Sequence, residues 1–265
     1  MHTPHPPLTD YYAAEADRAG WIRQLFDRTA VDYDRIERAM AFGSGPWYRR
    51  CALARAGLAS GMRVLDIGTG TGLTAREAAF LTGPSGTVVG VDPSAGMMDR
   101  ANVPSGVRLL RGTAEAVPLA PESADFVSMG YALRHVANLS AAFREFWRVL
   151  APGGRVCLLE ITPPKARLPR MLLKAYMRGV VPCMARWMGT HRDMPELMRY
   201  YWDTIEACAC PRTIQDILRE AGFVDVLRHV ELGIFSEYRG RKPPRGSAHP
   251  AAGGQERQAH HETGE

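Results

Sequence analysis

The first residues whose types and spacing could do chemistry lie between positions 63 and 79, in "RVLDIGTGTGLTAREAA". This short apolar run contains Asp66 and leads into three alternating glycines, Gly68, Gly70 and Gly72. A strand-to-helix turn of this kind lets the backbone approach a ligand closely and aims the positive end of the next helix at it. Leu73 occupies the position where a dinucleotide-binding GxGxxG motif needs a small residue. The carboxylate of Asp66 suits an ammonium group, which S-adenosylmethionine (SAM) carries, so the turn favours SAM.

Two further segments complete the predicted SAM site. Asp92 ends the next apolar run, "VVGVD", where a carboxylate can accept hydrogen bonds from ribose hydroxyls. After the third predicted strand, "RGTAEAVPL" places Thr113 and Ala114 where they could meet the adenine edge. Ligands of open α/β sheets bind outside the carboxyl ends of the strands, so the order of the three segments predicts one crevice.

A general base is expected where "GYALRHV" follows the fourth predicted strand. His135 is the leading candidate, because imidazole titrates near neutrality and the segment faces the acceptor side of the crevice. The alternative is that His135 only caps or hydrogen-bonds the backbone. Arg134 could orient a water molecule or stabilise a phenolate, or serve as a structural residue. Glu160, at the end of the fifth predicted strand, is a reserve base or a hydrogen-bonding anchor.

The elements that must position these residues alternate between strands and helices from about residue 61 to residue 159. Short apolar runs bounded by Gly and Asp alternate with helical patterns, which implies right-handed crossovers and a mostly parallel sheet. We predict a Rossmann-like α/β domain over residues 20–240, with a seven-stranded sheet and helices on both faces. Residues 20–58 are predicted to form helices interrupted near "GSGP", ahead of the first strand.

Three other segments have distinct compositions. Residues 1–19 are Pro- and His-rich and then polar, and we expect a flexible N-terminus. Residues 161–210, rich in Met, Trp and Tyr, are predicted to form a helical lid over the acceptor. Residues 241–265 contain almost no large apolar side chains and are expected to be disordered.

Charge and cysteine usage exclude several classes of function. The formal net charge is +5, without the clustered basic stripe that nucleic-acid binding needs, so no nucleic-acid partner is expected. The five cysteines are not spaced as a zinc site or a disulfide framework, so no metal is predicted. The chain contains no apolar run long enough to span a bilayer and no signal-peptide pattern, which favours the cytoplasm.

One helical stretch of the predicted lid is both basic and apolar. Arg170, Lys174 and Arg178 fall on one helical face, and a second face carries Leu173, Met177, Val180 and Met184. Such a helix either packs on the core with solvated charges or rests on an anionic membrane surface. We therefore consider peripheral contact with a membrane face, and also a homodimer, as possible partnerships.

The chain resembles the class I SAM-dependent methyltransferases of the UbiE type, which act in ubiquinone and menaquinone biosynthesis. The resemblance rests on "VLDIGTGTGLTA", "GVDPSAGM", "GTAEAVPL", "GYALRHV" and "FWRVLAPGGRVCLLEITPP", and it extends over about residues 31–242. It implies methyl transfer from SAM to a ring carbon of a prenylated hydroquinone. The acceptor would then be a small apolar aromatic or prenylated molecule.

The resemblance also implies roles for individual residues. SAM is expected near Thr74, Asp92, Thr113 and Ala114. Tyr33 and Asp34, in "VDYDRI", match a stretch that closes over SAM in the family, although a helix could carry them merely as a cap. The chain departs from the family pattern where Gly130 and His135 replace a common Ser and Asn. It departs again over residues 186–210, which would line the acceptor pocket.

Three alternatives remain open at this stage. The same fold could methylate carbon or oxygen of a specialised metabolite such as a phenol, a polyketide or an isoprenoid, and the divergent lid favours this reading. An NAD-dependent oxidoreductase is disfavoured by Leu73 and Asp66. A non-catalytic SAM-binding subunit would bind SAM without turnover.

Overall fold

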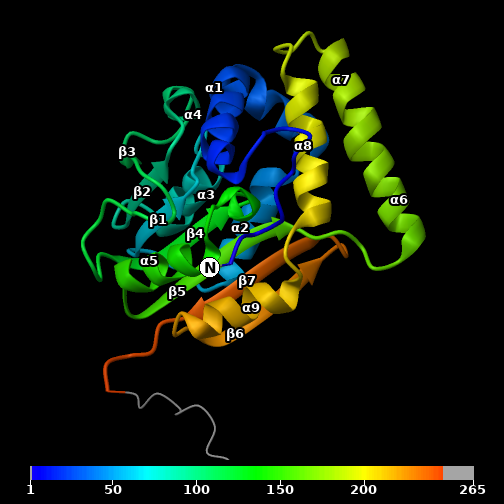
Figure 1. Ribbon diagram of the computed structural model, residues 1–265. Helices are drawn as coiled ribbons and strands as arrows, with labels where there is room; N and C mark the ends of the chain where they lie inside the picture. The colour runs from blue at the N-terminus through cyan, green and yellow to red at the C-terminus, as the bar shows by residue number, and fades with distance from the viewer. Residues whose placement is uncertain (1, 247–265) are drawn as a thin grey trace, which may run out of the picture.

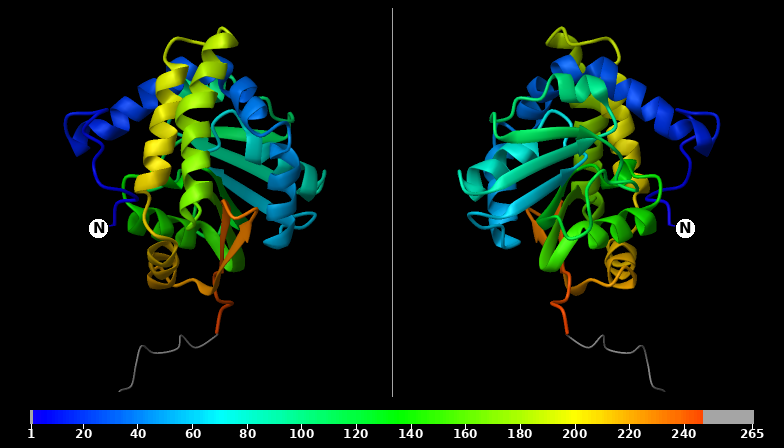
Figure 2. Two further views of the ribbon diagram at one scale, coloured as in Figure 1. Left: turned by 90° about the vertical axis from the view of Figure 1, so that its right-hand side faces the viewer. Right: turned by 90° about the vertical axis from the view of Figure 1, so that its left-hand side faces the viewer.

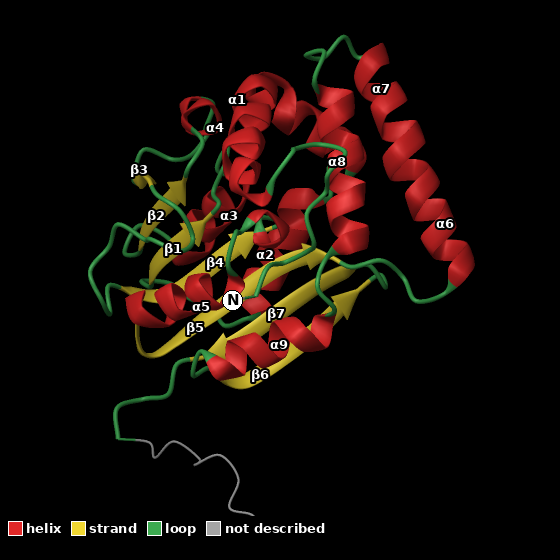
Figure 3. Cartoon of the chain, viewed as in Figure 1, coloured by secondary structure: helices red, strands yellow, loops and turns green. Residues whose placement is uncertain are grey.

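The computed structural model describes residues 2–246, which contain one seven-stranded sheet in the order β3-β2-β1-β4-β5-β7-β6 (Figures 1 and 3). The first five strands pair in parallel, and β7 lies antiparallel between β5 and β6. The strands are β1 Arg63–Ile67, β2 Thr87–Asp92, β3 Val107–Arg111, β4 Ala124–Gly130, β5 Leu150–Ile161, β6 Val224–Glu231 and β7 Phe235–Arg241. The predicted Rossmann-like sheet is confirmed.

Helices cover both faces of this sheet. One apolar core lies between the sheet and helices α5 (Leu139–Val149) and α9 (Pro211–Glu220). A second core packs the opposite face against α2 (Gly45–Arg55) and α3 (Leu73–Thr82). Because the central strands are buried on both faces, β1 is apolar at adjacent positions rather than at alternate ones, and Val64, Leu65 and Ile67 are all buried.

The long N-terminal helix and the insert form a third layer above the carboxyl ends of the strands (Figures 1 and 2). Helix α1 (Glu15–Met40) packs on α8 (Met194–Ala207). Between β5 and α8 the chain forms α6 (Arg167–Ala175), a π-helical turn (Tyr176–Val180) and α7 (Val181–Trp187). Leu173 and Met177 face inward and pack against this layer, so the insert is helical as predicted.

The N-terminal segment is not the loose arm expected from its composition. Helix α1 starts at Glu15, and the residues before it are tied to the domain by two backbone hydrogen bonds, Leu139 N to His2 O (2.8 Å) and Ala209 N to Pro4 O (2.6 Å). His5 and Tyr12 are buried. Composition gave no sign of this packing, because it depends on tertiary contacts: Tyr11 and Tyr12 meet Trp21 of α1, and Tyr11 also meets Tyr200 of α8, which is far along the chain.

The C-terminal boundary also shifts. Arg241 is the last residue of β7, and Lys242 is buried with its Nζ donating hydrogen bonds to the carbonyls of Trp147 (2.9 Å) and Leu150 (2.7 Å). The predicted disordered tail therefore cannot begin at residue 241. Its remaining part, residues 247–265, lies outside the described residues.

Two properties of residues 2–246 bear on possible partners. None of the helices there combines the length and apolar character that crossing a membrane requires. The same residues contain no group of three His, Cys, Asp or Glu side chains placed to hold a metal ion.

Candidate active site

The glycine turn places the backbone against a cavity at the carboxyl ends of the central strands. Gly68 (φ 64°) and Gly72 (φ 86°) both adopt left-handed conformations that other residues rarely reach. A Cβ atom on Gly68 would lie 2.5 Å from the Cβ of Ala132, and one on Gly72 would lie 2.2 Å from Cγ1 of Val103. Both glycines are therefore required by backbone conformation and by close approach together.

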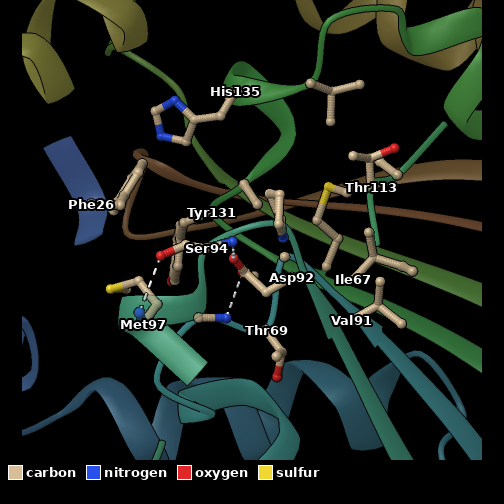
Figure 4. A pocket seen from close by; sticks show the side chains of 18 of the residues that line it. Phe26, Ile67, Thr69, Val91, Asp92, Ser94, Met97, Thr113, Tyr131 and His135 are labelled. Carbon is tan, nitrogen blue, oxygen red and sulfur yellow. Dashed lines mark hydrogen bonds between the residues drawn. The ribbon is translucent and has the colours of Figure 1, made fainter. Parts of the chain in front are cut away.

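The cavity brings together most of the residues predicted to bind SAM (Figure 4). Those that line it are Gly68, Gly70, Thr74, Asp92, Thr113, Ala114 and Gly130. Helix α1 covers the cavity from above with Ile22, Phe26 and Tyr33. Two of the predicted residues, Asp66 and Gly72, are not among the lining residues of this cavity.

Asp92 is oriented by the glycine turn itself. Its Oδ2 accepts a hydrogen bond from the backbone N–H of Gly70 (2.8 Å), and its Oδ1 accepts one from that of Ser94 (2.8 Å), as Figure 4 shows. Burial raises the pKa of the Asp92 carboxyl to about 6, and the two N–H groups oppose that effect. At neutral pH the group is an oriented carboxylate facing the cavity.

This pKa predicts how SAM affinity depends on pH. A carboxylate accepts hydrogen bonds from ribose hydroxyls better than a carboxylic acid does, so affinity should be full above pH 7 and should fall as the pH drops through about 6. Calorimetric titration with SAM from pH 8 to pH 5 measures this, and Asp92→Asn should flatten the curve. An unchanged affinity down to pH 5 in the wild type would contradict the assignment.

Asp66 occupies a different place from the one predicted. It is fully buried beneath the turn, where its Oδ1 accepts a hydrogen bond from Ser128 Oγ (2.7 Å), its neighbour across the β1–β4 pairing. Burial raises its pKa to about 6. The Asp66 side chain therefore links two strands and does not line the cavity, and its direct contact with an ammonium group stays a prediction.

His135 lies at the end of a short 3₁₀ turn, Leu133–His135, and its ring lines the cavity. Phe26 meets the ring edge-on at 5.3 Å between centroids, and Tyr200 stacks on it at 5.6 Å. Among the described residues neither ring nitrogen has a hydrogen-bond partner. Burial, assisted by the nearby cations Arg134 and Arg18, holds the pKa of His135 well below its usual value. The imidazole is neutral, so the expected titration near neutrality is wrong.

Arg134 and Glu160 turn away from the cavity and form a buried ion pair with each other. Glu160 Oε1 also accepts a hydrogen bond from the N–H of Ile161 (2.8 Å), and the Arg134 guanidinium lies 4.7 Å from the ring centroid of Tyr201. A carboxylate held this way lies outside the cavity, so the structure gives no support to Glu160 as reserve base. Arg134 reaches the cavity only through Tyr201, which lines it.

Breaking this buried pair should lower the stability of the fold. Glu160→Leu would leave the Arg134 guanidinium buried without its counter-charge, which typically lowers the free energy of unfolding by about 3–5 kcal/mol. Asp216→Ala, which breaks the exposed Arg219–Asp216 pair, is the control and should cost about 0.5 kcal/mol. Denaturant unfolding measures both variants. Equal losses would show that the buried charge is solvated in some other way.

Side-chain hydrogen bonds hold helix α1 over the cavity. Asp34 accepts a hydrogen bond from Thr71 Oγ1 on the glycine turn, and Asp27 accepts from Ser94 Oγ (2.5 Å). Tyr201 donates to the hydroxyl of Tyr33 (2.8 Å) across the cavity. Tyr33 thus lines the site, whereas Asp34 holds the covering helix.

Several lining residues were not predicted from the sequence: Phe26, Met97, Tyr131 and Tyr201. Phe26 precedes Tyr33 by two helical turns, so that spacing could have revealed an aromatic face on α1. Helix α4 (Ala95–Asp99), which carries Met97, follows directly from "VDPSAGM" and could have been assigned with it. Tyr201 carries no such local signal.

Comparison with known proteins agrees with this geometry. A family model described as the ubiE/COQ5 methyltransferase family matches residues 13–242. A demethylmenaquinone methyltransferase from Roseiflexus castenholzii is 38% identical, with 85% of this chain and 94% of that protein covered. A ubiquinone/menaquinone biosynthesis C-methyltransferase UbiE from Syntrophotalea carbinolica is 37% identical, with 82% and 92% covered.

A solved structure shows the shared fold. The SAM-dependent methyltransferase of Thermotoga maritima, described as a possible histamine N-methyltransferase, superposes with a TM-score of 0.58 at 24% identity, over 83% of this chain and 98% of that one. With the glycine turn, Asp92 and the family match in agreement, the chain is a SAM-dependent methyltransferase that belongs to the ubiE/COQ5 methyltransferase family.

Proposed function

We propose that this methyltransferase transfers a methyl group from SAM to a ring carbon of a prenylated hydroquinone or a similar apolar aromatic. The observation that carries the proposal is the aromatic lining beside the glycine turn, where Phe26, Tyr33, Tyr201 and His135 face one cavity. A flat, apolar ring fits such walls, and the neutral imidazole is a proton acceptor within them. Relatives named for menaquinone and ubiquinone biosynthesis support this class of acceptor.

The residues present fit SAM. Gly70, whose added Cβ would lie 3.1 Å from Cε of Met97, leaves a narrow approach to the backbone. Asp92 would hold the ribose hydroxyls, and Thr113 and Ala114 the adenine edge. The methionine end would lie along the glycine turn, near the remaining lining residues Gly68, Thr74 and Gly130. When bound, SAM supplies a methyl group on a positively charged sulfur, which is already a good leaving group.

The protein's task is then to align the acceptor and to manage one proton. His135 would accept the proton of an acceptor hydroxyl, which increases electron density at the neighbouring ring carbon where the new C–C bond forms. His135 would then pass the hydroxyl proton to solvent and accept the proton of the methylated ring carbon, which restores the aromatic ring, and it would return that proton to the ring oxygen. Helix α1 excludes water from the cavity, and the Arg134–Glu160 pair positions Tyr201 against the acceptor side.

The decisive experiment offers the enzyme a mixture of natural methyl acceptors, so that no acceptor is chosen in advance. Purified protein is incubated with methyl-labelled SAM and a dithionite-reduced solvent extract of the host cells, and labelled fractions are analysed by NMR. Label on a ring carbon in the prenylquinone fraction is expected. Label on oxygen, or in a small polar or pigment fraction, would instead mean that the fold serves a specialised metabolite.

A further inference from the structure

The outer side of the insert is unusual for a part of a folded domain. Helix α6, the π-helical turn and α7 follow one another without a break from Arg167 to Trp187, and this rod lies at the edge of the molecule (Figures 1 and 2). None of the nine residues of α6 is fully buried. Large apolar side chains point outward instead, with exposed fractions of 65% for Leu168, 66% for Met171, 62% for Leu172, 55% for Val180 and 89% for Trp187.

These side chains form one stripe rather than scattered positions. Leu168 and Leu172 are one helical turn apart, and beyond them a shallow apolar groove continues the line to the end of α7. The groove is lined by Ala175, Gly179, Val180, Cys183, Met184 and Trp187. At 1.5 Å per residue, the stripe runs for about 30 Å along the rod. We call Leu168, Met171, Leu172, Val180 and Trp187 the outer stripe.

The segment that carries the outer stripe has charges of a single sign. Between positions 161 and 192 the sequence contains no Asp or Glu but seven basic residues: Lys165, Arg167, Arg170, Lys174, Arg178, Arg186 and Arg192. Arg170, Lys174 and Arg178 pair with Glu206 and Asp203 of α8, which fastens the rod to the domain. Three other cations, Lys165, Arg167 and Arg186, are exposed and have no acidic partner within residues 2–246.

We propose that the outer stripe docks on the surface of an anionic lipid bilayer, with Leu168, Leu172 and Trp187 in the headgroup region and the basic residues on the lipid phosphates. Apolar residues flanked by cations, with an aromatic residue at one end, match the physical demands of that boundary. A second copy of the chain fits less well, because a two-fold contact would set the same cations against each other.

The membrane contact extends the proposed function, and its biological purpose rests on that proposal. A prenylated acceptor resides in the bilayer, and α8, which follows α7, carries Tyr201 into the cavity. A rod lying on the membrane would place the acceptor side of the cavity close to where such a molecule is held.

The test is sedimentation of the full chain with vesicles of phosphatidylcholine alone or mixed with phosphatidylglycerol. We expect binding to the mixed vesicles, weakened by salt. It should fall at least about tenfold when Leu168→Ser, Leu172→Ser and Trp187→Ser are combined. A second variant, combining Lys165→Gln, Arg167→Gln and Arg186→Gln, should weaken binding only to the anionic vesicles. All six positions are exposed, so both variants should fold, which circular dichroism checks.

Matched controls lie on other surfaces. Leu227→Ser removes an apolar side chain that is 58% exposed on β6. Combining Arg100→Gln, Arg108→Gln and Arg144→Gln removes the same charge elsewhere. Loss of vesicle binding in these controls to the same degree, or no binding by the wild type, overturns the proposal. So does a dimer in sedimentation velocity that the outer-stripe variant dissociates.

The two proposals fail in different ways. Methylation of a short-chain, water-soluble hydroquinone needs no vesicles, and the outer-stripe variant should keep it at the wild-type rate. Vesicle binding without methylation of any hydroquinone would overturn the proposed acceptor and leave the docking surface in place. Methylation of a hydroquinone without vesicle binding would overturn the docking surface and leave the proposed acceptor in place.

Discussion

Asp92→Ala is expected to abolish measurable SAM binding while the fold survives. The carboxylate is the only charged group proposed to meet the ribose, and hydrogen bonds to a charged group typically contribute about 1.5–3 kcal/mol each. Losing two of them corresponds to a decrease in affinity of about 10²–10⁴-fold. The substitution also removes the acceptor for the N–H groups of Gly70 and Ser94, so the turn loses its own support as well. Calorimetry with SAM measures the effect.

Two variants separate these contributions. Asp92→Asn keeps a side-chain oxygen for one N–H group but carries no charge, so it should lose less affinity than Asp92→Ala. Asp99→Ala removes an exposed carboxylate at the end of α4 and should bind SAM normally. Circular dichroism and the Tm of each variant show whether the fold is kept. Near-normal SAM affinity in a folded Asp92→Ala protein would remove Asp92 from the ribose role.

Local sequence patterns predicted the sheet and most of the residues on the glycine-turn side of the cavity because both depend on neighbouring residues. A turn that needs positive φ leaves glycines at fixed spacing, and the acid that follows a buried strand is visible in the same window. Asp92, Thr113 and Gly68 therefore line the cavity as expected. Asp66 shows the limit of this reasoning, since its neighbours do not reveal that Ser128 of β4 pairs with it.

The acceptor half depends on contacts between distant segments, which periodicity does not reveal. Tyr201 contacts Tyr33 across 168 positions of sequence, and Arg134 of the 3₁₀ turn pairs with Glu160 of β5. The N-terminal segment follows the same rule. Arg18 donates hydrogen bonds to the carbonyls of Arg134 (2.9 Å) and Val136 (3.3 Å), which secures the turn that carries His135. The composition of a short Pro-rich segment does not predict that one of its residues holds the turn that carries His135.

His135→Ala should leave SAM affinity within about twofold of the wild type and reduce kcat by about 10²-fold or more, the usual contribution of a positioned general base. The imidazole ring of His135 lines the cavity beside Phe26. His135 does not belong to the glycine turn. Single-turnover methylation of a hydroquinone, with SAM saturating, measures the chemical step. His191→Ala on the insert, outside the cavity, is the matched control and should be unaffected.

The lowered pKa of His135 sets the pH dependence. A base must be unprotonated to act, and this imidazole is already neutral well below its usual range, so its contribution should stay constant from pH 7 upward. The rate should fall only on the acid side, as the pH drops through the lowered value. Increasing activity between pH 7 and pH 9 would therefore report a different group.

His135→Asn separates a base from a hydrogen-bonding anchor. An amide can accept a hydrogen bond from the acceptor hydroxyl, but it does not take up a proton in this pH range. If His135 is the base, the Asn variant should be as slow as the Ala variant and should lose the acid limb of the pH profile. If Asn restores most of the rate, the residue orients the acceptor, and water must carry the proton away. That outcome would make the imidazole of His135 a group that holds the acceptor hydroxyl in place and leaves the proton transfer to another group.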